Sequence, residues 1–161
     1  MKKIILIFVL FALPLKALEI TCNFEEAYSN GDIQQGLLLI KKDKLRYEYS
    51  DENLYTLLYV NQKVFLINNT NTSQTQLIEN HNNLLPSILE IYDDFPNFKE
   101  VYIKNNYEIK IEKGSNKFIK RLIVKSKKLN VSVYFINCKE ALLEDKLFNF
   151  NPFYQYVPNK I

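Results

Sequence analysis

Period-two alternation of apolar and polar residues runs through most of this chain and limits what it can fold into. Leu45, Tyr47 and Tyr49 alternate with Arg46 and Glu48, a pattern typical of a strand with one buried face. Short turn-forming segments separate the runs, which favours an antiparallel meander because parallel strands need long crossovers. The other strand-like runs are residues 20–28, 36–41, 55–60, 64–68, 74–79, 107–112, 118–126 and 131–136.

One segment departs from the strand pattern. From Leu84 to Phe95 the apolar residues recur every three or four positions, which predicts an amphipathic helix of about three turns. Asn82 or Asn83 can cap its start, and Pro86 falls in the first turn, where its missing amide hydrogen costs nothing. A sheet with an apolar face needs a cover, so we expect the helix to be either a plain cover or a lid over a cavity.

The N-terminus has the order of a secretory signal. Lys2 and Lys3 precede an apolar run from Ile4 to Leu13, and Ala17 offers a small residue for cleavage. The run is shorter than a helix that crosses about 30 Å of hydrocarbon. We therefore expect residues 1–17 to be a signal peptide and residues 18–161 to be one domain in the periplasm, with an uncleaved anchor as the alternative.

The positive net charge belongs to that N-terminal segment. Lys2, Lys3 and Lys16 are three of the 21 basic residues, which leaves 18 basic residues against 18 acidic ones in the rest. The pI of 8.7 therefore gives no reason to expect nucleic acid as a partner.

Cys22 and Cys138 are the only cysteines in the chain. In an oxidising compartment we expect such a pair to form a disulfide, while free buried thiols and a redox role remain as alternatives.

Patterns typical of catalysis are missing from the sequence. His81 is the only histidine and stands in an Asn-rich stretch, and three glycines are too few for a phosphate loop. Glu25 and Glu26 are adjacent on a predicted strand and would face opposite sides, so they are poorly placed to act together. We predict that the protein is not an enzyme and has no catalytic residues, no cofactor and no metal.

Four segments, in order, carry a resemblance to a known family. Residues 36–49 form a glycine-led strand, a lysine turn and an aromatic-Arg-aromatic-acid-aromatic strand, and residues 57–67 form a strand, a turn and an aromatic-bearing strand. Residues 85–89 resemble a Pro-led helix, and residues 147–153 a closing Phe-x-Phe-x-Pro strand. This pattern resembles the periplasmic outer-membrane lipoprotein carriers (LolA-like). The chain departs from it by lacking a helix before the first strand and by having Lys41-Lys42-Asp43 at the family's Arg-Pro turn.

The resemblance implies an unclosed antiparallel half-barrel whose concave face is covered by the central helix. Between them, an apolar cavity would hold the acyl chains of a lipoprotein, received from an inner-membrane transporter and passed to an outer-membrane receptor by a monomeric carrier. Lys41 or Lys42 would lie at the mouth, near a head group or partner, unless this basic cluster is only a solvated strand end. The expected lipid-binding residues are Leu45, Tyr47, Tyr49, Phe65, Leu85, Ile88, Leu89 and Tyr92.

Two other interpretations remain at this point. The same fold can serve as a lipid- or lipoprotein-sensing or protein-binding module that does not shuttle cargo, or as a filled structural domain. A hollow between the predicted helix and Tyr47 and Tyr49 would favour ligand binding, and solid packing there would favour a structural role.

Overall fold

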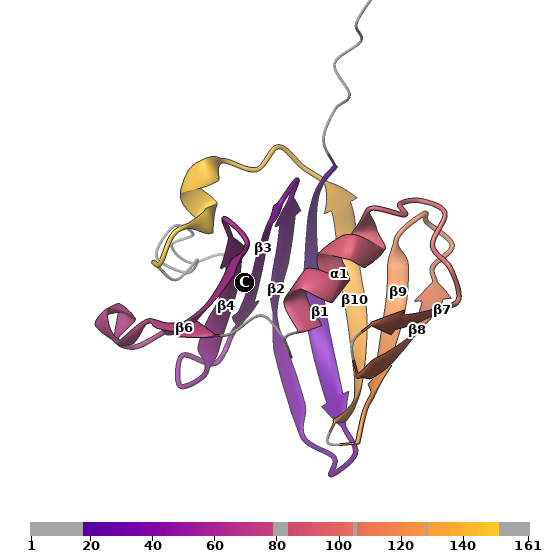
Figure 1. Cartoon of the computed structure of the whole chain (residues 1–161), viewed down its shortest axis with the longest axis horizontal. Coiled ribbons are helices and arrows are strands. Elements are labelled where there is room, and N and C mark those ends of the chain that lie inside the picture. Colours follow the sequence, from indigo (N-terminus) through magenta and orange to yellow (C-terminus); the bar gives the residue numbers. More distant parts are fainter. Residues whose placement is uncertain (1–17, 79–83, 105, 128, 152–161) are drawn as a thin grey trace, which may run out of the picture.

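The computed structural model describes residues 18–78, 84–104, 106–127 and 129–151. All its strands belong to one antiparallel sheet of ten strands, in the order β6-β5-β4-β3-β2-β1-β10-β9-β8-β7 (Figure 1). The strands are β1 (Glu19–Tyr28), β2 (Ile33–Lys41), β3 (Lys44–Tyr49), β4 (Tyr55–Val60), β5 (Lys63–Asn68), β6 (Gln76–Ile78), β7 (Val101–Lys104), β8 (Tyr107–Lys113), β9 (Ile119–Lys125) and β10 (Asn130–Glu140).

The sheet is curved but not closed, with β6 and β7 at its two edges. It consists of two meanders, β1 to β6 and β7 to β10, which meet where the first strand pairs with the last. Helix α1 (Leu84–Tyr92) connects the meanders and crosses the concave face in front of β1 and β10 (Figure 1). The predicted unclosed half-barrel with a covering helix is therefore confirmed. Within the described part of the chain, no helix is long and apolar enough to span a membrane.

Most predicted strands are present, with different ends. Strand β4 has its predicted limits, β2 and β10 are longer, and β6 is shorter because residues Thr72–Gln74 form a 3-10 turn. Strand β7 was not predicted. The helix ends at Tyr92 rather than Phe95. The Asp93 amide makes the last bond to a carbonyl four residues back, and the amides of Asp94 and Phe95 bond to carbonyls only three residues back. The proposed caps Asn82 and Asn83 lie outside the described residues.

The concave face and α1 enclose the main core. Alternate residues of β1, β2 and β3, such as Ile20, Leu38 and Leu45, are fully buried there. Ile91 and Tyr92, in the C-terminal half of α1, pack into the same core, and the Tyr92 ring meets Phe98 edge-on at 5.6 Å. This half of the helix is thus fixed by close aromatic packing.

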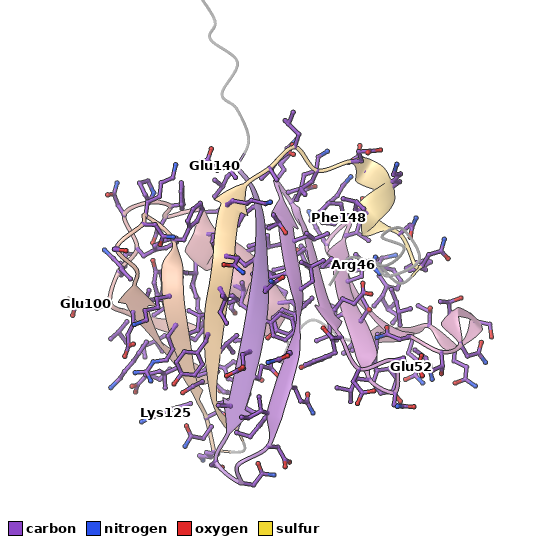
Figure 2. The ribbon with its side chains drawn as sticks, turned by 180° about the vertical axis from the view of Figure 1, so that it is seen from behind. Arg46, Glu52, Glu100, Lys125, Glu140 and Phe148 are labelled. Atoms are coloured by element: carbon purple, nitrogen blue, oxygen red, sulfur yellow. A yellow bond between two sulfur atoms is a disulfide. The ribbon has the colours of Figure 1, made fainter. Side chains whose placement is uncertain are left out.

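The C-terminal segment covers part of the convex face of the sheet, over β2, β4 and β5, which the sequence did not predict. Residues 147–153 were expected to form a closing strand, but the chain makes a 3-10 turn at Asp145–Phe148 instead, and residues 152–161 lie outside the described part. Phe148 and Leu143 pack on the outer face of β2, β4 and β5 (Figure 2). The convex face therefore has its own apolar cluster: Leu39, Leu58, Ile67, Leu143 and Phe148.

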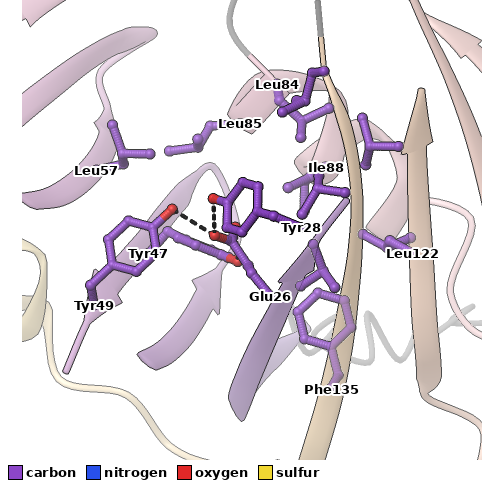
Figure 3. Close-up of a pocket in the computed structure, with 14 residues that line it drawn as sticks. Glu26, Tyr28, Tyr47, Tyr49, Leu57, Leu84, Leu85, Ile88, Leu122 and Phe135 are labelled. Carbon is purple, nitrogen blue, oxygen red and sulfur yellow. Dashed lines mark hydrogen bonds between the residues drawn. The ribbon is translucent and has the colours of Figure 1, made fainter. Parts of the chain in front are cut away.

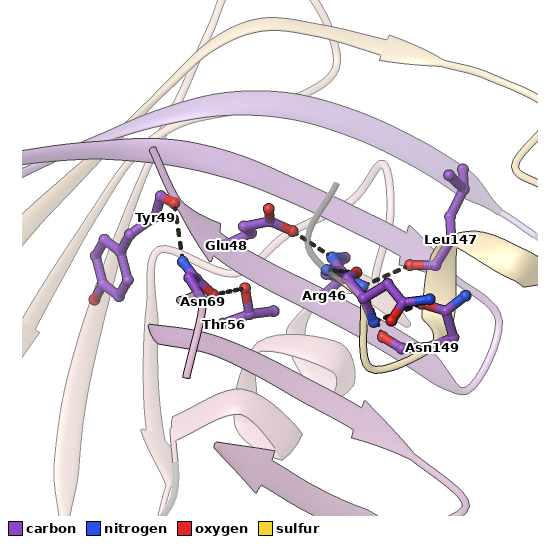
Figure 4. Close-up of polar contacts among 8 residues, drawn as sticks. Arg46, Glu48, Tyr49, Thr56, Asn69, Leu147 and Asn149 are labelled. Atoms are coloured by element: carbon purple, nitrogen blue, oxygen red, sulfur yellow. Dashed lines mark hydrogen bonds and ion pairs between the residues drawn. The ribbon is translucent and has the colours of Figure 1, made fainter. Parts of the chain in front are cut away.

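A buried arginine ties this segment to the sheet. The Arg46 side chain is 0% exposed and pairs with Glu48, Nε to Oε2 at 2.6 Å. Its terminal nitrogens donate to the carbonyl oxygens of Leu147, Asn149 and Asn151 at 3.0, 2.8 and 2.5 Å (Figure 4). Backbone carbonyls thereby satisfy a buried guanidinium that would otherwise be costly.

The expected disulfide joins Cys22 to Cys138, with an S–S distance of 2.07 Å. It links β1 to β10 at an irregularity in their pairing, between Thr21 and Asn23, where Asn137 has φ 56°. The bond closes a loop with a sequence separation of 116 residues and holds the two meanders together at β1 and β10, the strand pair through which they meet.

Replacing both cysteines by alanine is expected to lower the free energy of unfolding by about 2–5 kcal/mol, because the unfolded chain then gains the freedom of an unclosed loop. Urea unfolding followed by circular dichroism measures this. Wild-type protein in excess reductant is the matched control and should lose a similar amount. Equal stability of the oxidised, reduced and alanine forms would contradict the expectation.

Candidate functional site

A cavity of about 230 Å³ lies between the N-terminal half of α1 and the concave face of the sheet (Figure 3). Leu84, Leu85 and Ile88 in the first half of the helix form one wall of it, whereas Ile91 and Tyr92 in the other half pack in the core without lining it. The hollow that distinguishes a binding site from a filled core is therefore present. Its lining consists of Glu26, Tyr28, Tyr47, Tyr49, Leu57, Leu84, Leu85, Ile88, Leu122, Val124, Leu129, Val131, Val133 and Phe135.

Gly36 makes room for the stacked rings of Phe24 and Tyr47 beside this cavity. It pairs with Phe24 on the neighbouring strand, and the Phe24 ring lies over the place where a side chain would stand. A Cβ atom at Gly36 would lie 2.3 Å from Phe24 Cζ and 2.1 Å from the Glu48 carbonyl oxygen. The Phe24 ring in turn stacks on Tyr47 with centroids 3.8 Å apart. The missing side chain thus makes room for the stack that positions Tyr47.

A carboxylate lies at one side of the cavity and receives three tyrosine hydroxyls. Glu26 is 7% exposed. Tyr47 donates to its Oε1 at 2.7 Å, and Tyr28 and Tyr49 donate to its Oε2 at 2.5 and 3.0 Å (Figure 3). A carboxyl group in an apolar lining is costly unless it is hydrogen-bonded, and these three donors meet that need.

The same contacts hold the tyrosines in their neutral form. Burial, reinforced by the adjacent Glu26 carboxylate, raises the pKa of Tyr28 to about 12. Burial first and Glu26 second raise the pKa of Tyr47 and of Tyr49 well above the usual value. All three therefore keep their protons, and remain donors to Glu26, at physiological pH.

The structure brings four of the expected lipid-binding residues to the cavity: Tyr47, Tyr49, Leu85 and Ile88 line it. Three others lie close to it without forming its wall. Leu45 and Tyr92 are buried in the adjoining core, and Leu89 is a partly buried residue packed against that core. The helix therefore faces the cavity with its first half only.

The placement of Phe65 in the cavity is wrong. Directly paired residues share a face of an antiparallel sheet, and Phe65 pairs with Leu58, which pairs with Arg46 on the convex side. Phe65 packs in the convex cluster, and its ring meets Phe150 at 5.1 Å. Counting back from the two-residue turn at Asn61-Gln62 gives this pairing from the sequence alone.

The placement of Lys41 and Lys42 at the cavity mouth is also wrong. Lys41 pairs with Glu19, seven residues before Glu26 along β1, which is about 23 Å at the rise of an extended strand. The Lys41 ammonium donates to the Leu143 carbonyl oxygen at 2.5 Å, and thus helps to hold the C-terminal segment. Lys42 is an exposed turn residue with φ 51°.

Sequence reasoning missed Glu26 as part of the site. The prediction that Glu25 and Glu26 face opposite sides of the sheet is correct, because the Gln35 side chain donates a hydrogen bond to Glu25 on the other face. The alternation of β1 could have shown this position, because every second residue of a strand faces the same side and Glu26 follows the buried Cys22 and Phe24 at that spacing. Among the described residues, no group of three His, Cys, Asp or Glu side chains is arranged to hold a metal, and His81 lies outside them.

No protein-family model matches the chain, and no curated protein sequence matches it. Among solved structures, it is similar to the crystal structure of a LolA superfamily protein from Nitrosomonas europaea. The alignment covers 84% of this chain and 91% of the other, with 11% sequence identity and a TM-score of 0.45. At that level the likeness says nothing of what this chain binds.

Gly36→Ala is expected to destabilise the protein by about 1–3 kcal/mol, because the new methyl group meets the Phe24 ring and the strand backbone. Thermal or urea unfolding measures this. Gly114→Ala is the matched control: its Cβ would meet first the Asn116 side chain, which can rotate away, so the loss should be smaller. An equal loss of unfolding free energy in the two variants would contradict the role of Gly36 in making room for the Phe24–Tyr47 stack.

Tyrosine protonation should make stability depend on pH in the alkaline range. An unfolded tyrosine loses its proton near pH 10, whereas folded Tyr28 holds it to about pH 12 and Tyr47 also holds it above pH 10. The stabilisation is fully present below pH 10 and falls as pH rises through this window, by up to about 1.4 kcal/mol per pH unit for a fully buried tyrosine. Tyr47→Phe removes the contribution of one tyrosine to this pH dependence. The difference in free energy of unfolding between wild type and variant should therefore become smaller from pH 9 to pH 11. A difference that does not change with pH would contradict this prediction.

Proposed function

We propose that this protein is a periplasmic carrier that binds the acyl chains of lipoproteins in the cavity under α1 and delivers them toward the outer membrane. The observation that carries the proposal is the hollow between the first half of α1 and the sheet, where ten of the fourteen lining residues are Leu, Ile, Val or Phe. Each methylene group buried in such a lining contributes about 0.8 kcal/mol. On this proposal the protein is not an enzyme, and its partners are an inner-membrane lipoprotein transporter and an outer-membrane receptor.

The size of the hollow requires α1 to move for larger cargo. About 230 Å³ is less than the roughly 300–1,000 Å³ of sites for drug-sized ligands, so it accommodates part of one chain. Leu84 at the start of α1 is only partly buried, whereas Ile91 and Tyr92 near its end are fixed among Phe98 and the inner core. We therefore propose that the N-terminal half of α1 is a lid that swings on its packed C-terminal half.

The small volume also favours a second candidate. A module that senses a lipid or lipoprotein needs to enclose only one chain or one chain end, and needs no transfer partner. The two candidates differ in stoichiometry and release: a carrier gives up its cargo to a membrane receptor, and a sensor does not.

Native mass spectrometry of the protein, isolated from its cells without detergent, tests the proposal. A co-purified mass that dissociates as a lipid or lipoprotein would support the carrier and identify the cargo. A bare protein that stays bare after incubation with an acylated peptide would count against acyl-chain binding. The mass of the chain itself also reports whether residues 1–17 are removed.

Ile88→Glu should weaken acyl-peptide binding at least tenfold, because it places a carboxylate in the apolar wall of the cavity near Glu26. Isothermal titration calorimetry with a short acylated peptide measures this. Leu89→Glu puts the same charge one residue away, outside the lining, and should bind nearly as wild type.

Ile88→Phe provides a second route in case the glutamate variant fails to fold. It keeps the wall apolar but fills part of the hollow, so binding should fall while the fold, followed by circular dichroism, is retained. If both variants fold and bind the acylated peptide with wild-type affinity, the proposal that α1 forms part of the binding site is wrong.

A further inference from the structure

The polar groups of the cavity are gathered on one side. Among the described residues that line it, only Glu26, Tyr28, Tyr47 and Tyr49 carry polar side chains. Figure 3 shows these four together on one side, with Leu122 and Phe135 on the other. Leu57 and Leu85 also lie on the polar side, so an elongated ligand meets polar and apolar groups at one end and only apolar groups at the other. The polar side includes the half-buried Tyr28.

Every polar atom at that end can act only as a hydrogen-bond acceptor. Each tyrosine hydroxyl has one proton, and all three protons are donated to Glu26. An ionised carboxylate has no proton to donate. The lining as described holds no lysine, arginine or histidine. A ligand head in this place therefore finds a carboxylate and three hydroxyl oxygens with lone pairs, and no donor.

The carboxylate is not saturated by the tyrosines. Its two oxygens offer about four acceptor positions. Oε2 takes two hydroxyls, whereas Oε1 takes only the Tyr47 hydroxyl among the described residues. The Tyr47 and Tyr49 rings stand edge to face, with centroids 5.6 Å apart, and aromatic faces attract a nearby cation. An unused acceptor beside aromatic rings is suited to an ammonium group.

Building on the proposed function, we propose that Glu26 and its three tyrosines select cavity ligands whose polar head is a hydrogen-bond donor, above all a primary ammonium, and exclude carboxylate and phosphate heads. An ammonium group supplies up to three donors and the opposite charge. A carboxylate head supplies no donor and meets the Glu26 charge in a lining of low polarity, where repulsion is strong. The apolar chain then lies along Leu122, Val133 and Phe135.

Three probes with the same eight-carbon chain separate the head from the chain: octanol, octylamine and octanoate. Their affinities for the purified protein are measured by isothermal titration calorimetry at pH 7.5, where the amine is positive and the acid negative. Octanol tests only the apolar cavity. We expect octylamine to bind at least tenfold more tightly than octanoate, with octanol between them.

Glu26→Gln tests the residue that sets this preference. The amide removes the negative charge and adds a donor, so the ratio of octylamine to octanoate affinity should fall at least tenfold, with octanol binding little changed. Glu25→Gln is the matched control: it makes the same charge change one residue away, on the opposite face, and should keep the wild-type ratio. Tyr49→Phe, which keeps the carboxylate, should retain most of the preference if Glu26→Gln does not fold.

The outcomes distinguish the two proposals. If octanol binds but octanoate binds as tightly as octylamine, the head-group selection is overturned and the apolar cavity stands. An equal shift of the ratio in the Glu25 and Glu26 variants assigns the preference to overall charge and also overturns it. If none of the three probes binds, the proposed function and the selection both fail.

Discussion

The structure depends on one constraint: in the described part of the chain, one short α-helix covers the concave face of a wide sheet. Nine residues of α1 span about 13 Å, whereas ten strands at about 4.8 Å spacing extend about 43 Å before curvature. Curvature brings the sheet around the helix but does not close the gap. Aromatic side chains fill it at the C-terminal half of α1, around Phe98, and leave it open at the N-terminal half. The cavity is thus a result of an incomplete cover.

The opposite face shows the alternative solution. There the chain's own C-terminal segment closes the apolar surface, and Arg46 holds it through backbone carbonyls that any sequence can supply. The C-terminal segment therefore covers the convex face over β2, β4 and β5, whereas a helix covers the concave face incompletely. Polar groups are buried on both faces. Arg46 donates its hydrogen bonds to Glu48 and to backbone carbonyls, whereas Glu26 lines the cavity and its Oε1 accepts one tyrosine hydroxyl among the described residues.

The sheet was readable from the sequence because period-two alternation and short turns report local geometry. What alternation does not give is which of the two faces is covered, and by what. Alternation shows which residues of one strand share a face, but which face that is depends on the pairing with the next strand. Phe65 was placed on the wrong face because that pairing is set by the number of residues in the turn. Strand β7 was missed because it has only four residues. The 3-10 turn before Asn149 was missed because a residue far away in the sequence, Arg46, holds the segment around it. Glu26 was missed because an inward carboxylate contradicts the apolar pattern unless its tyrosine partners are known.

The pairing of the first strand with the last has a consequence for how the molecule is made. Strand β1 leaves one edge open until β10, about a hundred residues later, arrives to occupy it. An open strand edge is where a partly made chain can pair with a neighbouring molecule, and charged residues discourage such pairing. Glu19, Glu25 and Glu26 give β1 three negative charges during that interval. The carboxylate that later faces the cavity thereby also protects the unfinished sheet from aggregation.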